Sequence, residues 1–187
     1  GVENRGLNRW GLNWVAGKEY EGRVWARCDK PVRLTVSAMD ANGNTLSARR
    51  LDLKPWNWRR LDFTLVPSRT EHNGSFTIVL NSPGSVDLGF AYLEPANWGR
   101  FRGLPVRADI AEGLRAQNLT VLRYGGSMVN APEYRWKSQT GPRDERQPYK
   151  GHWYPYSTNG WGIADFLDLC EWLNAVGIPA FNMDETP

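Results

Sequence analysis

The stretch LRYGGSMVNAPEYRWKSQTGPRDERQPYKGHWYPYSTNGWG, Leu122–Gly162, decides how the second half of the chain is interpreted. A short apolar segment, Thr120–Tyr124, runs into Gly125-Gly126, and the residues up to Gly162 then show neither a helical nor an alternating pattern. Loops longer than about 12–15 residues are uncommon in compact domains and are usually functional or disordered. Disordered segments contain few aromatic residues, whereas this loop is rich in Tyr and Trp. We therefore expect an ordered, functional loop whose flat rings hold a sugar.

The first half of the chain has the pattern of β-strands. Apolar and polar residues alternate in six segments, which are 20–27, 32–38, the residues up to 53, 61–65, 76–80 and 86–92. Such alternation predicts strands with one buried face. Asn42-Gly43 is a strong hairpin signal between two of them, and short strands at regular spacing favour a β-sandwich. We assign residues 1–97 to this domain.

The pattern changes after Pro95. The expected elements are a helix over 106–118, a strand over 120–124, a helix over 163–175 that Gly177 ends, and a strand over 178–182. Strands that alternate with helices predict a parallel sheet. Parallel strands need cover on both faces, which two strands and two helices cannot supply. Residues 98–187 are therefore expected to be the opening of a larger α/β domain, with the remainder on the same gene or on another chain.

Composition excludes several classes of function. The net charge is only +3 and the arginines are scattered, whereas nucleic-acid binding usually needs a basic patch. No apolar run is long enough to span a membrane, and no signal peptide is visible, so the compartment stays open. Cys28 and Cys170 form no CxxC motif and are expected to be free and buried. With only two histidines, no His-rich metal site is expected, and no cofactor is implied.

Ligands of parallel α/β domains bind outside the carboxyl ends of the strands. The candidate residues at that end are Arg123, Ser127, Asn130, Trp153 and Asn182. Gly125-Gly126 permits a tight turn or a close approach of the backbone to a ligand. A phosphate cradle is excluded, because no Gly-Lys-Ser/Thr is present and no helix begins directly after the glycines.

The roles of several residues remain open at this stage. Arg123 lies in an apolar strand, so we expect it to be buried and paired with a carboxylate, either as a structural ion pair or in contact with substrate. Trp153 either stacks on a sugar or packs within the loop. Tyr134 and Trp136 are expected in the core of the loop, and residues 143–146 (RDER) as a salt-bridged turn.

Asp184 and Glu185 follow the last predicted strand. Glycosidases use two carboxyl groups about 5–9.5 Å apart on either side of the scissile bond. Adjacent residues usually point in different directions, so these two are not expected to form the catalytic pair.

The motifs LRYGGSMVNAPEYRWKSQTGPRDERQ and HWYPYSTNGWGIADFLDLCEWLNAVGIPAFN resemble family-51 glycoside hydrolases, the α-L-arabinofuranosidases. The resemblance spans residues 104–182. It rests on Arg123-Tyr124-Gly125-Gly126, Trp136, Gly141-Pro142, Arg146, Trp153, Gly162 and Cys170-Glu171. The preceding β segment is similar to the carbohydrate-binding-type jelly roll that some members insert between the first barrel strand and the first barrel helix. The resemblance thus implies a jelly roll followed by the opening βα units of a (β/α)8 TIM barrel.

The same resemblance implies a retaining hydrolase that releases α-L-arabinofuranosyl residues from plant cell-wall polysaccharides such as arabinan and arabinoxylan. Its two catalytic glutamates come from later strands, so no catalytic residue is expected in this chain, and the chain alone is expected to be inactive. Ser127 stands where the family usually has Asn or Cys in contact with the arabinose, and Trp153 matches a Trp that lines the subsite. Two alternatives remain, namely a carbohydrate-binding or structural module without catalysis and an endo-acting glycanase of the same family. A homo-oligomer is also left open.

Overall fold

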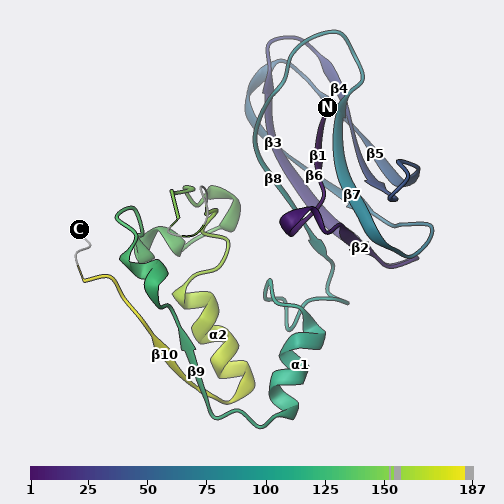
Figure 1. The fold of residues 1–187 in the computed structure, drawn as a ribbon. Helices are drawn as coiled ribbons and strands as arrows, with labels where there is room; N and C mark the ends of the chain where they lie inside the picture. The colour runs from purple at the N-terminus through teal and green to yellow at the C-terminus, as the bar shows by residue number, and fades with distance from the viewer. Residues whose placement is uncertain (152, 154–156, 184–187) are drawn as a thin grey trace. The chain divides into compact units, whose positions relative to one another are not determined.

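The computed structural model describes residues 1–151, 153 and 157–183 (Figure 1). The chain divides into two compact units, Gly1–Trp98 and Gly99–Pro187. The first unit is built from strands, and the second combines two helices and two short strands among its described residues.

The first unit consists of two antiparallel sheets. One sheet has the order β1-β7-β4-β5, with β2 also paired to β7, and the other has the order β6-β3-β8. The strands are β1 (Val2–Asn4), β2 (Leu12–Trp14), β3 (Tyr20–Cys28), β4 (Val32–Met39), β5 (Thr45–Leu53), β6 (Trp56–Leu65), β7 (Glu71–Leu80) and β8 (Asp87–Pro95). The 3-10 turn η1 (Leu7–Arg9) lies between β1 and β2.

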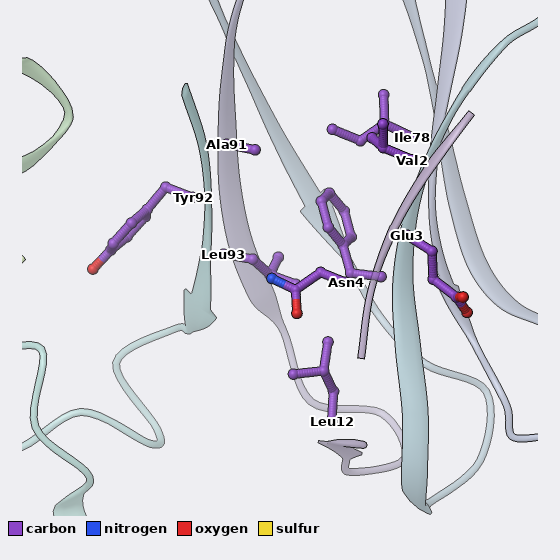
Figure 2. A pocket seen from close by; sticks show the side chains of 9 residues that line it. Val2, Glu3, Asn4, Leu12, Ile78, Ala91, Tyr92 and Leu93 are labelled. Carbon is purple, nitrogen blue, oxygen red and sulfur yellow. The ribbon is translucent and has the colours of Figure 1, made fainter. Parts of the chain in front are cut away.

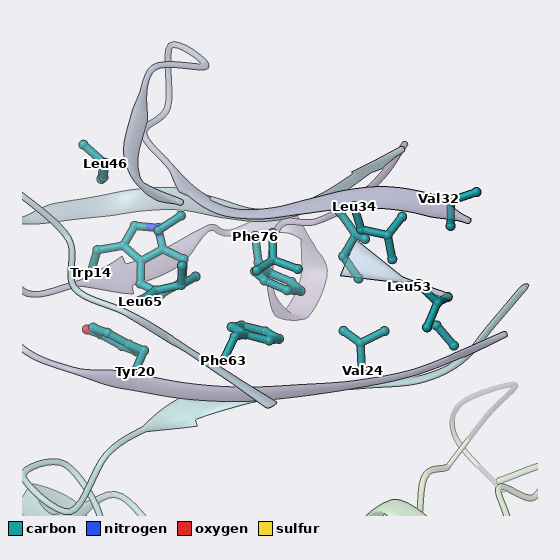
Figure 3. Close-up of a cluster of buried hydrophobic side chains, with 14 of the residues drawn as sticks. Trp14, Tyr20, Val24, Val32, Leu34, Leu46, Leu53, Phe63, Leu65 and Phe76 are labelled. Carbon is teal, nitrogen blue, oxygen red and sulfur yellow. The ribbon is translucent and has the colours of Figure 1, made fainter. Parts of the chain in front are cut away.

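The alternating residues of these strands form one core between the two sheets. Val24 of β3, Leu34 of β4 and Leu65 of β6 are almost fully buried, and Figure 3 shows their neighbours converging from both sheets. The six segments predicted as strands correspond to β3 to β8, which confirms the expected sandwich pattern. The sequence did not predict β1 and β2, because strands of three residues are too short to show a period of two.

The predicted Asn-Gly turn joins β4 to β5 as a hairpin. Gly43 has φ +83° and its N–H donates to the Asp40 carbonyl. The buried Asp40 carboxylate accepts hydrogen bonds from the backbone N–H groups of Asn42 (2.9 Å) and Asn44 (2.7 Å) and from the Asn44 amide (2.8 Å). Arg69 also pairs with this carboxylate. The Asn44 side-chain hydrogen bond is the main reason why the pKa of Asp40 is lowered below its usual value.

The second unit contains the expected helices and a parallel strand pair. The elements are α1 (Ala108–Ala116), β9 (Val121–Tyr124), the turns η2 (Ser127–Asn130), η3 (Trp136–Gln139) and η4 (Arg143–Glu145), α2 (Ile163–Leu173) and β10 (Val176–Pro179). The two strands pair in parallel from Val121 opposite Val176 to Tyr124 opposite Pro179. The helix–strand alternation predicted from the sequence is thus confirmed.

The end of α2 differs from the expectation. The helix ends at Leu173, because Asn174 adopts a left-handed conformation with φ +55°, and Asn is one of the few residues that tolerate this conformation. Gly177 therefore lies within β10 and does not end the helix. A Cβ atom at Gly177 would approach Cys170 Sγ and a ring carbon of Phe166 to 3.1 Å, so the glycine lets the strand lie against α2.

One face of the β9–β10 pair is covered and the other is open. Leu122 packs into a core of five buried residues, Phe101, Leu104, Ala111, Leu169 and Leu173. On the other face Val121 is 49%, Val176 64% and Ile178 52% exposed. Cys170 of α2 and Cys28 of β3 are free and buried, as the sequence predicted. Among the described residues, no helix combines the length and the apolarity needed to cross a bilayer.

Candidate functional site

The candidate site lies where β9 and β10 end. Ala180 N–H donates to the Tyr124 carbonyl at 2.8 Å, which continues the strand pairing by one residue. Gly125 has φ +110°, and a Cβ atom there would lie 2.6 Å from the Ala180 Cβ. Gly125 therefore allows a close approach to the neighbouring chain segment.

Three of the predicted site residues follow the ends of these two strands. Ser127 and Asn130 lie on η2, two and five residues after Gly125, and both are exposed. Between them, Val129 is buried and anchors the turn. Asn182 follows β10 and is half-buried. Because the two strands are parallel, all three residues follow the strand pair at the same edge.

Trp153 belongs to the second half of the long loop. Its side chain is 70% exposed, so the indole is accessible to solvent. The adjoining predicted loop residues His152, Tyr154 and Tyr156 lie outside the described residues, as do Asp184 and Glu185.

Arg123 does not have the predicted environment. It is exposed on β9, and the described residues show no ion pair to it. Side chains alternate across a strand, so Arg123 shares the open face with Val121, whereas Leu122 packs into the core. In the described part of the chain that face of β9 has no cover, so the expected burial beside a carboxylate is not seen there and stays a prediction.

The long loop has a small core of its own. Val129, Ala131 and Tyr134 are buried in it, with Trp136 and Tyr149 packed against them. The rings of Tyr134 and Tyr149 meet edge to face at 6.1 Å, and those of Trp136 and Phe181 at 5.4 Å. The prediction that Tyr134 and Trp136 form the loop core is confirmed.

A buried carboxylate ties this loop to helix α2. Asp165 Oδ1 lies 2.5 Å from Arg143 Nη2, and Asp165 Oδ2 lies 3.0 Å from Arg146 Nη1. The Gly162 N–H also donates to Asp165 Oδ2 at 2.9 Å, which caps the first turn of the helix. The Asp165 and Arg146 side chains are 8% and 5% exposed. Both arginines of the predicted salt-bridged turn thus form their ion pairs with Asp165 of α2.

The two arginines also bind backbone carbonyl groups at both ends of the second half of the loop. Arg146 donates to the carbonyls of Gly141 (3.1 Å) and Asn159 (2.9 Å), and Arg143 donates to that of Gly160 (3.1 Å). Charge-assisted hydrogen bonds of this kind are about twice as strong as neutral ones. The sequence placed Asp165 in the first turn of the helix, where it suits the helix dipole, but its ion pairs with Arg143 and Arg146 were not predicted.

Tyr124 lies beside the network at the end of β9. Its ring stacks on Phe166 of α2 at 5.3 Å, and its hydroxyl donates to the Trp161 carbonyl at 3.4 Å. Burial is the main cause that raises the pKa of Tyr124 to about 12, with smaller contributions from Tyr134, Tyr149 and Asp165. The hydroxyl therefore stays protonated at neutral pH and acts as a hydrogen-bond donor.

The polar and aromatic side chains after β9 and β10 are of the kinds that bind a polar ligand. A hydroxyl, two amides and an exposed indole are supported by a packed loop that ion pairs fix to a helix. Such groups position a ligand by hydrogen bonds and stacking, and the protein supplies a rigid support for them. The described residues include no group of three or more His, Cys, Asp or Glu side chains that could hold a metal ion.

Comparisons with known proteins show which proteins the chain, and the segment with the candidate site, are similar to. Residues 113–185 match the alpha-L-arabinofuranosidase 1 domain. Alpha-L-arabinofuranosidase 1 of Arabidopsis thaliana is 25% identical over 97% of this chain and 28% of its own length. Alpha-L-arabinofuranosidase C of Emericella nidulans is 35% identical over 41% of this chain and 15% of its own length.

A solved structure shares the fold. The arabinose-bound MgGH51 α-L-arabinofuranosidase superposes with a TM-score of 0.83 and 21% identity, over 98% of this chain and 32% of its own. The present chain therefore covers only about a third of the solved structure, and it covers 28% of the Arabidopsis thaliana relative. The similarity that the sequence motifs indicated is confirmed: the chain resembles part of an α-L-arabinofuranosidase over almost its whole length, and residues 113–185 match the domain that carries this name.

Proposed function

We propose that the chain is the N-terminal portion of a retaining glycoside hydrolase that releases α-L-arabinofuranosyl residues from plant polysaccharides such as arabinan and arabinoxylan. One observation carries the proposal. The segment that matches the α-L-arabinofuranosidase 1 domain, residues 113–185, includes the β9–β10 pair and the loop that Asp165 ties to α2. In parallel α/β domains this end of the strands is where ligands bind.

The second unit is proposed to be the opening of a (β/α)8 barrel, over residues 98–187, after a jelly-roll insert over residues 1–97. The open face of the β9–β10 pair supports this assignment. Val121, Val176 and Ile178 are about half exposed or more on that face, and parallel strands are normally covered on both faces. Further strands and helices of the same barrel, on the same gene or on another chain, would supply the cover.

Five residues are proposed to contact the sugar. Ser127, Asn130 and Asn182 would exchange hydrogen bonds with its hydroxyl groups, and Trp153 would stack on one face of the ring. Arg123 faces the side on which the remaining barrel strands would lie, so its guanidinium is proposed to contact either a barrel carboxylate or the substrate. The exposure of Ser127, Asn130 and Trp153 supports these roles.

The bond-breaking groups are proposed to lie outside this chain. A retaining glycosidase needs a nucleophile and a general acid/base whose carboxyl groups are about 5–5.5 Å apart. The resemblance assigns both to glutamates on later barrel strands. In this proposal the chain contributes the walls of the sugar subsite, and residues 1–187 alone have no hydrolytic activity.

Hydrolysis of p-nitrophenyl α-L-arabinofuranoside tests the proposal. The longer protein should release nitrophenol with retention at the anomeric carbon, whereas residues 1–187 should release none. In the longer protein, Trp153→Ala and Ser127→Ala should each lower kcat/KM by about tenfold or more, which corresponds to about 1.4 kcal/mol of lost transition-state binding. Turnover by residues 1–187, or no turnover by the longer protein, would contradict the proposal.

A second candidate is a carbohydrate-binding module without catalysis. It is favoured by Trp10, which is 74% exposed on the first unit. An endo-acting glycanase is a further alternative within the same family. Product sizes from arabinan separate these cases, because free arabinose indicates exo action, oligosaccharides indicate endo action, and binding without products indicates a module.

A further inference from the structure

The loop between β1 and β2 holds an exposed tryptophan on a closed ring of backbone. Trp10 is 74% exposed, slightly more than Trp153 at 70%. The ring closes through the Gly11 N–H, which donates to the Arg5 carbonyl at 2.8 Å. Inside it, the Trp10 N–H donates to the Leu7 carbonyl at 3.1 Å. The loop therefore has a defined shape although its side chains face solvent.

The backbone of this loop is unusual. Asn8 and Arg9 have φ +52° and +58°, a conformation that is unfavourable for residues other than glycine and that is often found at functional sites. Gly11, with φ +92°, is pressed against β7, since a Cβ atom there would lie 2.5 Å from Asn73 Cα. The surrounding structure thus holds Arg9 and Trp10 in an outward conformation that a free loop would not favour.

A polar cavity opens beside this loop. Glu3, Asn4, Arg5, Gly6 and Arg9 line a volume of about 510 Å³. It shares Glu3 and Asn4 with a second cavity of about 420 Å³ between the edges of β1 and β8. Figure 2 shows the side chains of Asn4, Leu12 and Leu93 pointing into this second space. The two cavities meet at Glu3 and Asn4, and we refer to them together as a groove, whose polar part, lined by Arg5 and Arg9, we call its mouth.

The mouth of the groove carries uncompensated positive charge. Arg5 and Arg9 make no ion pair within the described residues, and Glu3 is the one carboxylate among the residues that line the mouth. The first unit as a whole has thirteen Lys and Arg against ten Asp and Glu, which accounts for the net charge of +3 of the chain. Two guanidinium groups without an ion pair favour an anionic sugar over a neutral one, because they attract negative charge.

We propose that this groove, which we call the β1–β2 groove (Glu3, Asn4, Arg5 and Arg9), binds a uronic-acid group on a polysaccharide together with the exposed Trp10, which follows Arg9 in the chain. The planar fork of an arginine matches a carboxylate in a bidentate geometry. Trp10, exposed and next to Arg9 in the chain, would supply a flat ring for the apolar face of the sugar. The proposal rests on the proposed function for the choice of a plant glycan as the ligand, and it adds a specific chemical group and a site on the first unit.

Calorimetry on the 187-residue chain tests this with two probes, xylotriose that carries one glucuronic acid and plain xylotriose. The acidic probe should bind with a Kd of about 1 mM or tighter, at least tenfold tighter than the neutral probe. Its affinity should fall at about 0.5 M salt, because exposed charges are then screened. Arg9→Gln and Trp10→Ala should each weaken binding at least tenfold, and Trp10→Phe, which keeps a ring, should weaken it less.

The matched control is Arg49→Gln, which removes the same charge from an exposed position on β5. The proposal is overturned if both probes bind equally, if no heat is observed at about 10 mM probe, or if Arg49→Gln weakens binding as much as Arg9→Gln. Circular dichroism confirms that each variant is folded. Hydrolysis of the aryl arabinofuranoside by the longer protein, measured separately, distinguishes the two proposals. Acidic-probe binding without hydrolysis would reject the proposed function and support the β1–β2 groove.

Discussion

Asp165 shows how much a single residue contributes to the candidate site. Its two carboxylate oxygens bind Arg143, Arg146 and the first turn of α2. A buried charge without partners is costly, so the three charged side chains depend on one another. The exposed Ser127, Asn130 and Trp153 belong to the same long loop, whose second half these contacts fasten to the helix.

Asp165→Asn should destabilise the second unit by about 3 kcal/mol, because it leaves Arg146 buried beside a neutral amide. Asp168→Asn, at an exposed position of the same helix, is the control and should change stability by less than about 0.5 kcal/mol. Urea unfolding followed by circular dichroism measures both. Equal unfolding midpoints for the two variants would show that the ion pairs do not hold the loop.

Asp40 predicts a pH dependence in the first unit. Its pKa is lowered in the folded protein. The ionised side chain therefore contributes its full stabilisation above the pKa of an Asp side chain in the unfolded chain, about 3.9. This contribution is lost as the pH falls through the lower folded-state pKa. Asp40→Asn should therefore have a lower Tm than the wild type at pH 7, with a difference that shrinks below about pH 4. Asp29→Asn, at an exposed position, is the control, and a pH-independent difference for Asp40→Asn would refute the assignment.

At the scale of elements, the junction of β9 and β10 determines where the site can form. The two strands approach so closely after Tyr124 that only glycine fits at position 125. The chain then enters η2 and presents Ser127 and Asn130. The Gly-Gly pair was predicted to allow a close approach, and the approach observed is to Ala180 of the neighbouring segment.

Gly125→Ala should destabilise the second unit by about 2–3 kcal/mol, because it combines an unfavourable φ with a steric overlap. Gly141→Ala is the matched variant. Gly141 also has positive φ, +78°, but a Cβ atom there would have no neighbour within 4 Å. It should cost only about 1 kcal/mol. Thermal unfolding separates the two, and equal losses would mean that the contact with Ala180 relaxes without cost.

At the scale of the whole molecule, the two units differ in how completely they bury their apolar residues. The first unit encloses its core between two sheets. The second unit leaves one face of its strand pair open, with Val121, Val176 and Ile178 exposed. Exposed apolar residues gathered on one face are typical of an interaction surface, which is the basis for proposing further barrel strands.

The double variant Val121→Thr/Ile178→Thr tests this cover. In the 187-residue chain it should reduce self-association in sedimentation experiments without loss of helix. In the longer protein the same change should lower stability by about 2–4 kcal/mol, because two hydroxyl groups would be buried without partners. Val79→Thr on β7, also exposed, is the control. A negligible effect in the longer protein would mean that the face stays open.

The sequence by itself determined the strands that are long enough to show a period of two, the Asn-Gly hairpin and the helix–strand alternation. Each follows from local patterns of side chains and turn residues. It also determined the core of the long loop, because Tyr134 and Trp136 are aromatic residues in a segment without regular structure. The motifs around Arg123-Tyr124-Gly125-Gly126 were enough to indicate the relationship that the comparisons confirmed.

The tertiary structure alone decided the partners of the charged residues. Arg143 and Arg146 are about twenty residues from Asp165 in the chain, so no local pattern pairs them, and the exposure of Arg123 depends on which strands lie beside β9. Local patterns also did not predict the three-residue strands β1 and β2 or the end of α2 at the left-handed Asn174. Periodicity shows which side of a helix or strand is apolar. Which residues form ion pairs, and which strand faces are covered, depends on the distant segments that meet in the fold.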